Sequence, residues 1–85
     1  MDGIVCPIVH LNGTSKEELV NLRREFAHAL RLAETKLAEM APSGRDYYPK
    51  PGLMTDAVTQ HNRRMDMLKK LYDEIVFEVE HLQDV

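Results

Sequence analysis

Residues Met54–Leu82 have the sequence MTDAVTQHNRRMDMLKKLYDEIVFEVEHL. Apolar or aromatic side chains fill eight of nine positions that alternate at intervals of four and three: Met54, Val58, His61, Met65, Leu68, Tyr72, Ile75, Val79 and Leu82. This alternation keeps one face of an α-helix apolar and is typical of helices that pack along a coiled-coil seam. The stretch therefore predicts a helix over 55–83, with Thr55 as its N-cap.

A second helical pattern lies upstream. Apolar residues recur every seven residues at Leu19, Phe26, Ala33 and Met40, with Leu22, Leu30 and Leu37 between them. Ser15 or Thr14 can cap the start, because a glutamate three residues after each completes a capping box. Pro42 and the Ser-Gly pair after it end the pattern. We therefore expect a helix over 15–41, roughly 39 Å long at the α-helical rise per residue.

The segment 42–54, between the two patterns, is a predicted loop, because it holds three of the four prolines and two of the four glycines. With 85 residues, the chain is expected to form a single domain, 1–85. Two long amphipathic helices joined by one loop predict an all-α fold, an antiparallel two-helix hairpin.

Residues 1–13 are predicted to form an extended arm. Ile4–Leu11 is rich in β-branched residues and precedes the Asn12-Gly13 turn signal. Pro7 lacks an N–H, which would limit the segment to a sheet edge, and the chain offers no second strand. Two interpretations stay open: the segment pairs with its copy in another subunit, or it lies as an apolar arm across the helices. We favour the second.

The C-terminal end of the second helix is apolar on almost all sides, since Leu71, Val76 and Phe77 lie outside the seam. One partner helix cannot cover so much of its circumference. We therefore expect a homo-oligomer whose interface uses Leu71–Leu82. Two hairpins in a four-helix bundle are the simplest assembly, and higher assemblies stay open.

Composition limits the partners. The 11 Lys and Arg against 14 Asp and Glu give a formal net charge of −3, which disfavours duplex nucleic acid, whereas a compact anion needs only a few local cations. No run is apolar enough to span a membrane, and the first residues do not match an export signal. Cys6 is the only cysteine, which is typical of a reducing compartment. We expect a cytoplasmic protein that needs no cofactor.

No catalytic or metal-binding group stands out. Glu25 and His28, and likewise Glu78 and His81, match the Glu-x-x-His pair of metal-binding helical bundles. Their sequence neighbours take the inward positions, however, so both pairs are expected on the surface and without a metal. Cys6 has no basic cluster or helix N-terminus beside it to activate its thiol. We therefore expect a protein that is not an enzyme.

His61 is the one polar residue among the nine seam positions. It is expected either as a structural histidine bonded to Glu34 or to a backbone carbonyl, or as a residue that fixes the helix register or lines a central ligand cavity. Arg63 and Arg64 form a small cationic cluster and are a further candidate for ligand contact.

The loop carries Arg45, Tyr47, Tyr48 and Lys50, which offer two ring faces and two cations. Aromatic rings stack on bases, and cations bind phosphates, so the loop is a candidate nucleotide-binding segment. The alternative is a purely structural role for the loop, in which one tyrosine closes the open end of the hairpin and the other has no role.

Two further segments are His10-Leu11-Asn12-Gly13-Thr14-Ser15 before the first helix and Gly44-Arg45-Asp46-Tyr47-Tyr48-Pro49 in the bend. They resemble segments of small, largely uncharacterised proteins of tailed phages and prophages. The likeness runs from about Ile8 to Leu71. In size and helical, oligomeric character the chain is also similar to the phage anti-CBASS and anti-Thoeris sponges, which sequester nucleotide signals of bacterial immunity. This similarity of architecture implies a phage-type binding protein in the cytoplasm of the infected bacterial host.

These two segments lie at opposite ends of one hairpin, so they can form one pocket only between two chains. The loop residues Arg45, Tyr47, Tyr48 and Lys50 of one chain would meet the following residues of another: His10, Asn12, Gly13, Thr14 and Ser15. Free N–H groups at a helix N-terminus favour a phosphate, although Glu17 and Glu18 would repel it unless they cap the helix or bind ribose.

The predicted function is sequestration of a small anionic nucleotide, a cyclic dinucleotide or an ADP-ribose derivative, at pockets between subunits. The alternative is an interaction module that docks onto a host or phage protein through the arm and the patch around Phe77. A third and weaker option is a small accessory protein of the virion or of DNA packaging.

Overall fold

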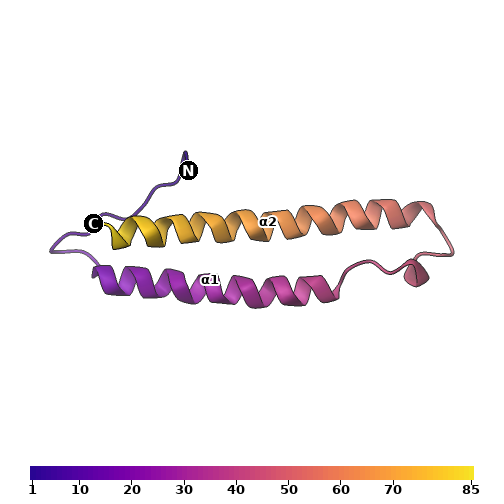
Figure 1. The fold of residues 1–85 in the computed structure, drawn as a ribbon, viewed down its shortest axis with the longest axis horizontal. Coiled ribbons are helices and arrows are strands. Elements are labelled where there is room, and N and C mark those ends of the chain that lie inside the picture. The colour runs from indigo at the N-terminus through magenta and orange to yellow at the C-terminus, as the bar shows by residue number, and fades with distance from the viewer.

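The computed structural model describes all 85 residues and contains two long helices (Figure 1). α1 spans Lys16–Glu39, α2 spans Gly52–Gln83, and one 3-10 turn, η1, covers Gly44–Asp46 between them. No strand forms. The all-α class predicted from the sequence is therefore confirmed. Neither helix combines the length and the apolar character that a membrane span requires.

α1 begins after Ser15, whose Oγ accepts a hydrogen bond from the backbone N–H of Glu18 at 3.1 Å. Of the two caps that the sequence allowed, Ser15 is the one that forms, and Thr14 lies outside the helix. Glu17 and Glu18 both lie in the first turn, where negative charge interacts favourably with the N–H groups at the end of the helix.

α1 ends at Glu39, two residues before the predicted end. The N–H groups of Met40 and Ala41 bond to carbonyls three residues back, at 2.9 and 3.1 Å, so the helix closes in a tighter turn before Pro42. The link between the helices is therefore 40–51, where the sequence predicted 42–54.

α2 begins three residues earlier than predicted, at Gly52, and Thr55 is not its N-cap. Pro51 precedes the first helical residue with φ −56° and ψ −30°, which are helical values. A proline ring holds φ near this value and lacks an N–H, and the first N–H groups of a helix have no partner within the helix in any case. The Pro-Gly pair therefore starts the helix instead of extending the loop.

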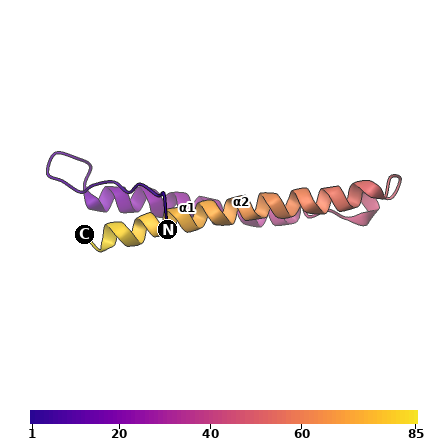
Figure 2. The same ribbon diagram turned by 90° about the horizontal axis from the view of Figure 1, so that it is seen from above.

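The chain runs out along α1 and returns along α2, which extends past the end of α1 (Figure 1). Lys16, the first residue of α1, donates to two backbone oxygens at the end of α2, at 3.3 and 2.6 Å. Further along, Arg23 pairs with Glu78 at 3.0 Å and Arg31 lies over the ring of Tyr72 at 4.0 Å. The molecule measures 62 × 24 × 17 Å, and the view from above shows the same elongated outline (Figure 2).

The predicted apolar seam of α2 is its most protected stripe. Leu82 is fully buried, and the other seam residues are half-buried except Val58, which is 39% exposed. Tyr72 and Val79 of this seam line a hollow together with residues of α1. The regular spacing of four and three therefore identified the face of α2 that meets α1.

The face of α1 that meets α2 matches the predicted one only in part: Leu30 is buried and Leu19 and Leu37 are half-buried, whereas other members of the pattern are exposed. Val20 and Leu30 are its buried residues, at 6% and 8% exposure. Phe26 and Met40, two members of the predicted seven-residue repeat, are 44% and 64% exposed. The apolar pattern of α1 is broad, and the side of it that includes Leu30, together with Val20, faces α2; this orientation also places Arg23 beside a carboxylate of α2.

The N-terminal segment lies along the side of α2 that faces away from α1 (Figure 1). Two hollows mark this contact. The first is lined by Met1, Asp2, Ile4, Lys70, Asp73 and Glu74, and the second by Cys6, Pro7, Ile8, Val9, His81 and Val85. Residues 4–10 have no regular secondary structure, so within one chain the segment is an arm against α2 and makes no strand pairing.

The arm changes the expected oligomer interface, Leu71–Leu82. Phe77 is half-buried and, by the helical period, lies on the same side of α2 as Lys70 and His81, which line the two hollows under the arm. Leu82 has no exposed surface left for another subunit. Part of the surplus apolar surface of α2 is therefore covered by the arm of the same chain. The sequence pattern favoured an arm across the helices but assigned this apolar surface to another subunit.

The core is small for a chain of this length. Val20, Leu30 and Leu82 are the buried residues, and 6499 Å² of surface is exposed, where a compact monomer of this mass exposes about 5,200 Å². The radius of gyration is 18.2 Å, compared with about 12 Å for a compact domain of the same length. The elongated shape thus leaves an excess of about 1,300 Å² of surface uncovered.

Replacing Ser15 with alanine removes the acceptor for the Glu18 N–H. We expect Ser15→Ala to lower the free energy of unfolding by about 1 kcal/mol, the usual effect of losing an N-cap. Urea unfolding followed by circular dichroism measures the change. Thr14→Ala is the matched control, because Ser15 and not Thr14 caps the helix. Equal losses in the two variants would contradict the assignment of the cap.

Candidate functional site

The predicted nucleotide-site residues lie at the two ends of the molecule (Figure 1). His10 and Asn12–Ser15 lie just before α1, beside the end of α2, and Arg45–Lys50 lies in the link at the far end. The molecule is 62 Å long, so one chain does not bring the two groups together. A site that uses both groups requires a second chain, and it stays a prediction.

The turn before α1 is tight. The Gly13 N–H bonds to the His10 carbonyl at 3.2 Å. The His10 imidazole folds over this turn, with Nε2 2.6 Å from the position that a Cβ on Gly13 would take. A side chain at Gly13 would therefore displace the imidazole. The Ser15 Oγ at the end of the turn accepts a hydrogen bond from the Glu18 N–H.

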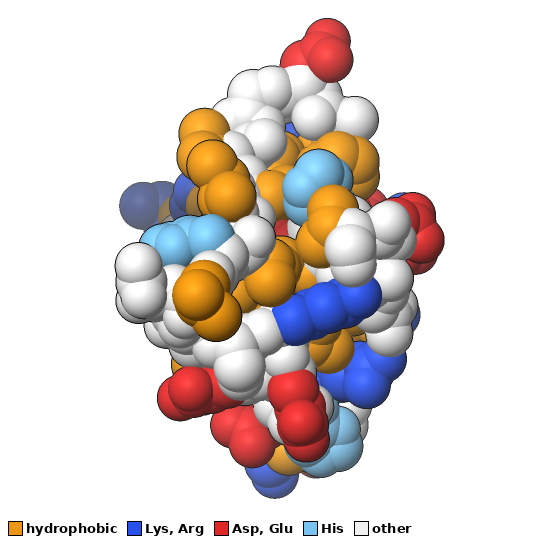
Figure 3. Space-filling model, turned by 90° about the vertical axis from the view of Figure 1, so that its left-hand side faces the viewer, with side chains coloured by type: hydrophobic (Ala, Val, Ile, Leu, Met, Phe, Trp, Pro, Cys, Tyr) orange, Lys and Arg blue, Asp and Glu red, His pale blue; other side chains and the backbone are white.

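The surroundings of this turn are acidic. A hollow on the adjoining face of α1 is lined by Ser15, Glu17, Glu18, Asn21, Leu22 and Glu25. Figure 3 looks onto this end of the molecule and shows acidic side chains gathered along its lower edge, the α1 side. The one lysine in the first turn, Lys16, is bonded to carbonyls at the end of α2. This end therefore disfavours an anion within one chain.

The link at the other end consists of consecutive turns. The N–H groups of Asp46, Tyr47 and Lys50 bond to carbonyls three residues earlier, at 3.0, 3.1 and 3.0 Å. Tyr48 is 76% exposed, whereas Tyr47 is half-buried in a hollow that it shares with Leu53, Asp56, Ala57 and Gln60. Tyr47 therefore packs against α2, and Arg45, Tyr48 and Lys50 stay exposed.

His61 does not bond to Glu34. The Glu34 carboxylate accepts from Arg31 at 3.4 Å, and Arg31 lies against Tyr72, well beyond His61 along α2. The register of the two helices therefore separates His61 from Glu34. His61 is half-buried. Arg63 makes a weak contact within its own helix, with Nη1 at 4.0 Å from the Met67 sulfur.

The two Glu-x-x-His pairs stay apart. Glu78 is bonded to Arg23 between the helices and its side chain is only 15% exposed, so the expectation that it is a solvated surface residue is wrong. Glu25 and His28 are exposed on α1, and His81 is exposed beside the arm. No three His, Cys, Asp or Glu side chains form a group that could hold a metal ion.

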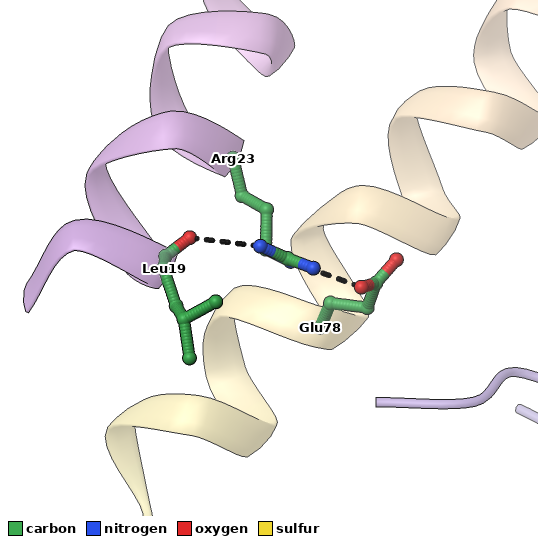
Figure 4. A network of polar contacts seen from close by, with 3 residues as sticks. All are labelled: Leu19, Arg23 and Glu78. Carbon is green, nitrogen blue, oxygen red and sulfur yellow. Dashed lines mark hydrogen bonds and ion pairs between the residues drawn. The ribbon is translucent and has the colours of Figure 1, made fainter. Parts of the chain in front are cut away.

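Arg23 links the two helices (Figure 4). Its Nε donates to Oε1 of Glu78 at 3.0 Å, and its Nη1 donates to the Leu19 carbonyl at 3.1 Å. The Arg23 and Glu78 side chains are 22% and 15% exposed. Breaking a charge pair that is mostly out of water is costly, because one partner keeps its charge without the other. The pair therefore helps to fix which face of α1 meets α2.

A groove between the helices is the strongest candidate for a ligand site. It has a volume of about 320 Å³ and is lined by Arg24, Ala27, His28, Arg31, Tyr72, Val76 and Val79. Its three basic residues stand at intervals of four and three, which places them on one face of α1. The volume is at the lower end of the range for small-molecule sites. The groove thus combines an apolar floor with up to three positive charges.

Arg31 is held in place by α2. Its guanidinium carbon lies 4.0 Å from the centre of the Tyr72 ring, within cation–π distance, and its Nη1 pairs with Glu34 at 3.4 Å. Tyr72, and to a smaller extent Glu34, raise the pKa of Arg31. Arg24 and His28 are exposed beside it and form no ion pair. They are free to meet an anion.

Sequence reasoning did not identify this groove. The sequence pattern put His28 in an outward Glu-x-x-His pair and indicated no ligand role for Arg24. The spacing of Arg24, His28 and Arg31 was a signal in the sequence. Tyr72 and Val76 join them only through the register of α1 against α2, which the spacing alone does not determine.

The Arg23–Glu78 pair is open to a double-mutant cycle. We expect Arg23→Gln and Glu78→Gln to show a coupling free energy of about 1–2 kcal/mol in urea unfolding, because the pair is largely removed from water. Lys36 and Glu39 form the control pair, with side chains 80% and 62% exposed, and should couple by only a few tenths of a kcal/mol. A coupling at Arg23–Glu78 no larger than in the control would contradict its role between the helices.

Comparison of the chain with models of protein families, with curated proteins and with solved structures gave no match.

Proposed function

We propose that the chain is a non-enzymatic helical binding module that functions as a homo-oligomer of antiparallel hairpins. The observation that carries the proposal is the small core. Three side chains are buried in the whole chain, while fifteen large hydrophobic side chains are exposed. A folded domain gains its stability mainly by removing apolar surface from water, so a hairpin with this exposure is completed by association.

The amount of uncovered surface supports this proposal. An interface of standard size buries roughly 800 Å² on each partner. The hairpin exposes about 1,300 Å² more surface than a compact monomer, which is more than the area that each partner buries in such an interface. Two hairpins that pack side by side enclose a second layer of side chains between four helices, as in four-helix bundles.

Self-association predicts a stability that depends on concentration. We expect light scattering to give the mass of two or more chains in the micromolar range. The melting temperature should fall on dilution, because association stabilises the folded state by mass action. A mass of one chain together with a melting temperature that does not change with concentration would contradict the proposal.

A second candidate function is the capture of a small anionic ligand, and the groove favours it. Arg24, His28 and Arg31 line the groove beside Tyr72, in a chain whose net charge is −3. Cations next to an aromatic ring suit a ligand that carries both a phosphate and a base.

The resemblance to phage sponges implies a special case of this candidate, in which the ligand is a nucleotide signal of bacterial immunity and the host is an infected bacterium. The groove supports anion capture in the middle of the hairpin. The carboxylates of Glu17 and Glu18 at the start of α1 weigh against the turn-and-loop site that the sequence suggested.

Calorimetric titration separates the groove from the loop. The probes are cyclic dinucleotides, ADP-ribose and inorganic phosphate. We expect Arg24→Ala to weaken binding of any probe that binds at least tenfold, a loss of about 1.4 kcal/mol. Arg45→Ala, which changes an exposed arginine of the loop, should leave it unchanged.

The opposite pattern, with loss in Arg45→Ala alone, would assign the ligand to the loop and reject the groove. Binding of none of the probes would reject this second candidate and leave the self-associating module without a small ligand.

A further inference from the structure

An apolar stripe on α1 is left uncovered. Leu22, Phe26 and Met40 are 53%, 44% and 64% exposed, and Ala29 and Ala33 are exposed between them. The spacing of these residues puts the first four in sequence order on one face of the helix, and Met40, the residue directly after α1, continues the same line. The contact between the two helices separates this face from the groove. On α1, this face and the groove residues lie on opposite sides of the buried residues.

α2 adds two apolar side chains to the same side. Met67 and Leu71 are 51% and 38% exposed, and by helical spacing they lie on the side of Tyr72 opposite to Val76, a groove residue. Leu71 is next to Tyr72, and Tyr72 contacts Arg31 of α1. Leu71 therefore lies at the same height along the hairpin as the α1 stripe. The apolar flank, as we call this surface, consists of Leu22, Phe26, Ala29, Ala33, Met40, Met67 and Leu71.

We propose that a second copy of the chain covers the apolar flank, with α1 packed antiparallel against α1 of that copy and the two-fold axis between Ala29 and Ala33. The inference rests on the homo-oligomer proposed above and names its surface and register. In this register Leu22 meets the partner's Met40, and Ala29 meets the partner's Ala33. Because the axis falls well inside α1, the two copies overlap along most of their length.

Side-chain size supports this register. The distance between two packed helices depends on the side chains at their contact, so alanines near the axis let the two α1 helices approach closely. The larger residues Leu22 and Met40 then meet each other toward the two ends of the contact. Small and large side chains thus fill the interface in a complementary way.

Charge also distinguishes antiparallel from parallel packing. In the proposed register Glu25 lies beside the partner's Lys36, and Phe26 lies against the aliphatic stem of that lysine. Parallel packing would set Glu25 against the partner's Glu25, which is unfavourable. Lys36 is bonded here only to Glu39, across 3.3 Å at an exposed surface, and such a pair contributes little. Lys36 is therefore available to the partner.

Disulfide cross-linking tests the register. Cys6 is replaced by serine, and one cysteine is placed at Leu22 or at Met40, both exposed. After subunit exchange, we expect a mixture of Leu22→Cys and Met40→Cys proteins to form mainly the mixed disulfide on mild oxidation. Each variant alone should stay largely reduced, because neither position faces its own copy. Efficient self-linking of each variant would indicate parallel packing and overturn the inference.

Insertion of a charge is the second test. Phe26→Glu should reduce the mass measured by light scattering to that of one chain, because it places a carboxylate in the proposed interface. Leu32→Glu is the matched control, since Leu32 is 58% exposed on the same helix but lies outside the stripe, and it should keep the parent mass. Circular dichroism checks that both variants stay helical. A parent-like mass for Phe26→Glu would reject the flank as the interface.

The two proposals fail in different ways. If the parent protein has the mass of several chains but neither the cysteines nor Phe26→Glu behave as expected, the homo-oligomer stands and the apolar flank is not its interface. If the parent protein has the mass of one chain, both proposals fail.

Discussion

The packing of α1 against α2 is the contact on which the rest of the structure depends, since helices of this length draw most of their stability from an apolar face that is packed against something else. Val20, Leu30 and Leu82 supply the buried surface of that contact, and Arg23 and Glu78 supply a polar link at 3.0 Å. Together they determine which side of α1 faces α2. Every other surface of the molecule, including the groove and the apolar flank, follows from that orientation.

A single contact between two helices leaves most of each helix in water. The chain covers part of the remainder itself, because the N-terminal arm lies over the outer side of α2 beside Lys70 and His81. Nothing comparable covers Leu22 and Phe26 on α1, which are 53% and 44% exposed. The arm and the proposed second copy thus both remove apolar surface from water, on different sides of the hairpin.

The all-α class and the apolar face of α2 could be predicted from the sequence. Apolar residues at intervals that alternate without a break between four and three residues all lie on one face of a helix. The inward face of α1 could be predicted only in part: Leu30 of the predicted pattern is buried, but Val20 and Arg23, which also face α2, are not members of that pattern. The start of α2 was missed because Pro51 and Gly52 act here as a helix start. The candidate groove was missed for a related reason, since residues of both helices form it only after their register is set.

The central claim is that one hairpin is an incomplete unit and that another copy completes it side by side. Small-angle X-ray scattering in solution tests this most directly, because it reports mass and length together. We expect a mass of two chains with a maximum dimension little greater than the 62 Å of one hairpin, since side-by-side packing adds thickness and almost no length. A particle with the mass of one chain and the 18.2 Å radius of gyration of the isolated hairpin would contradict it.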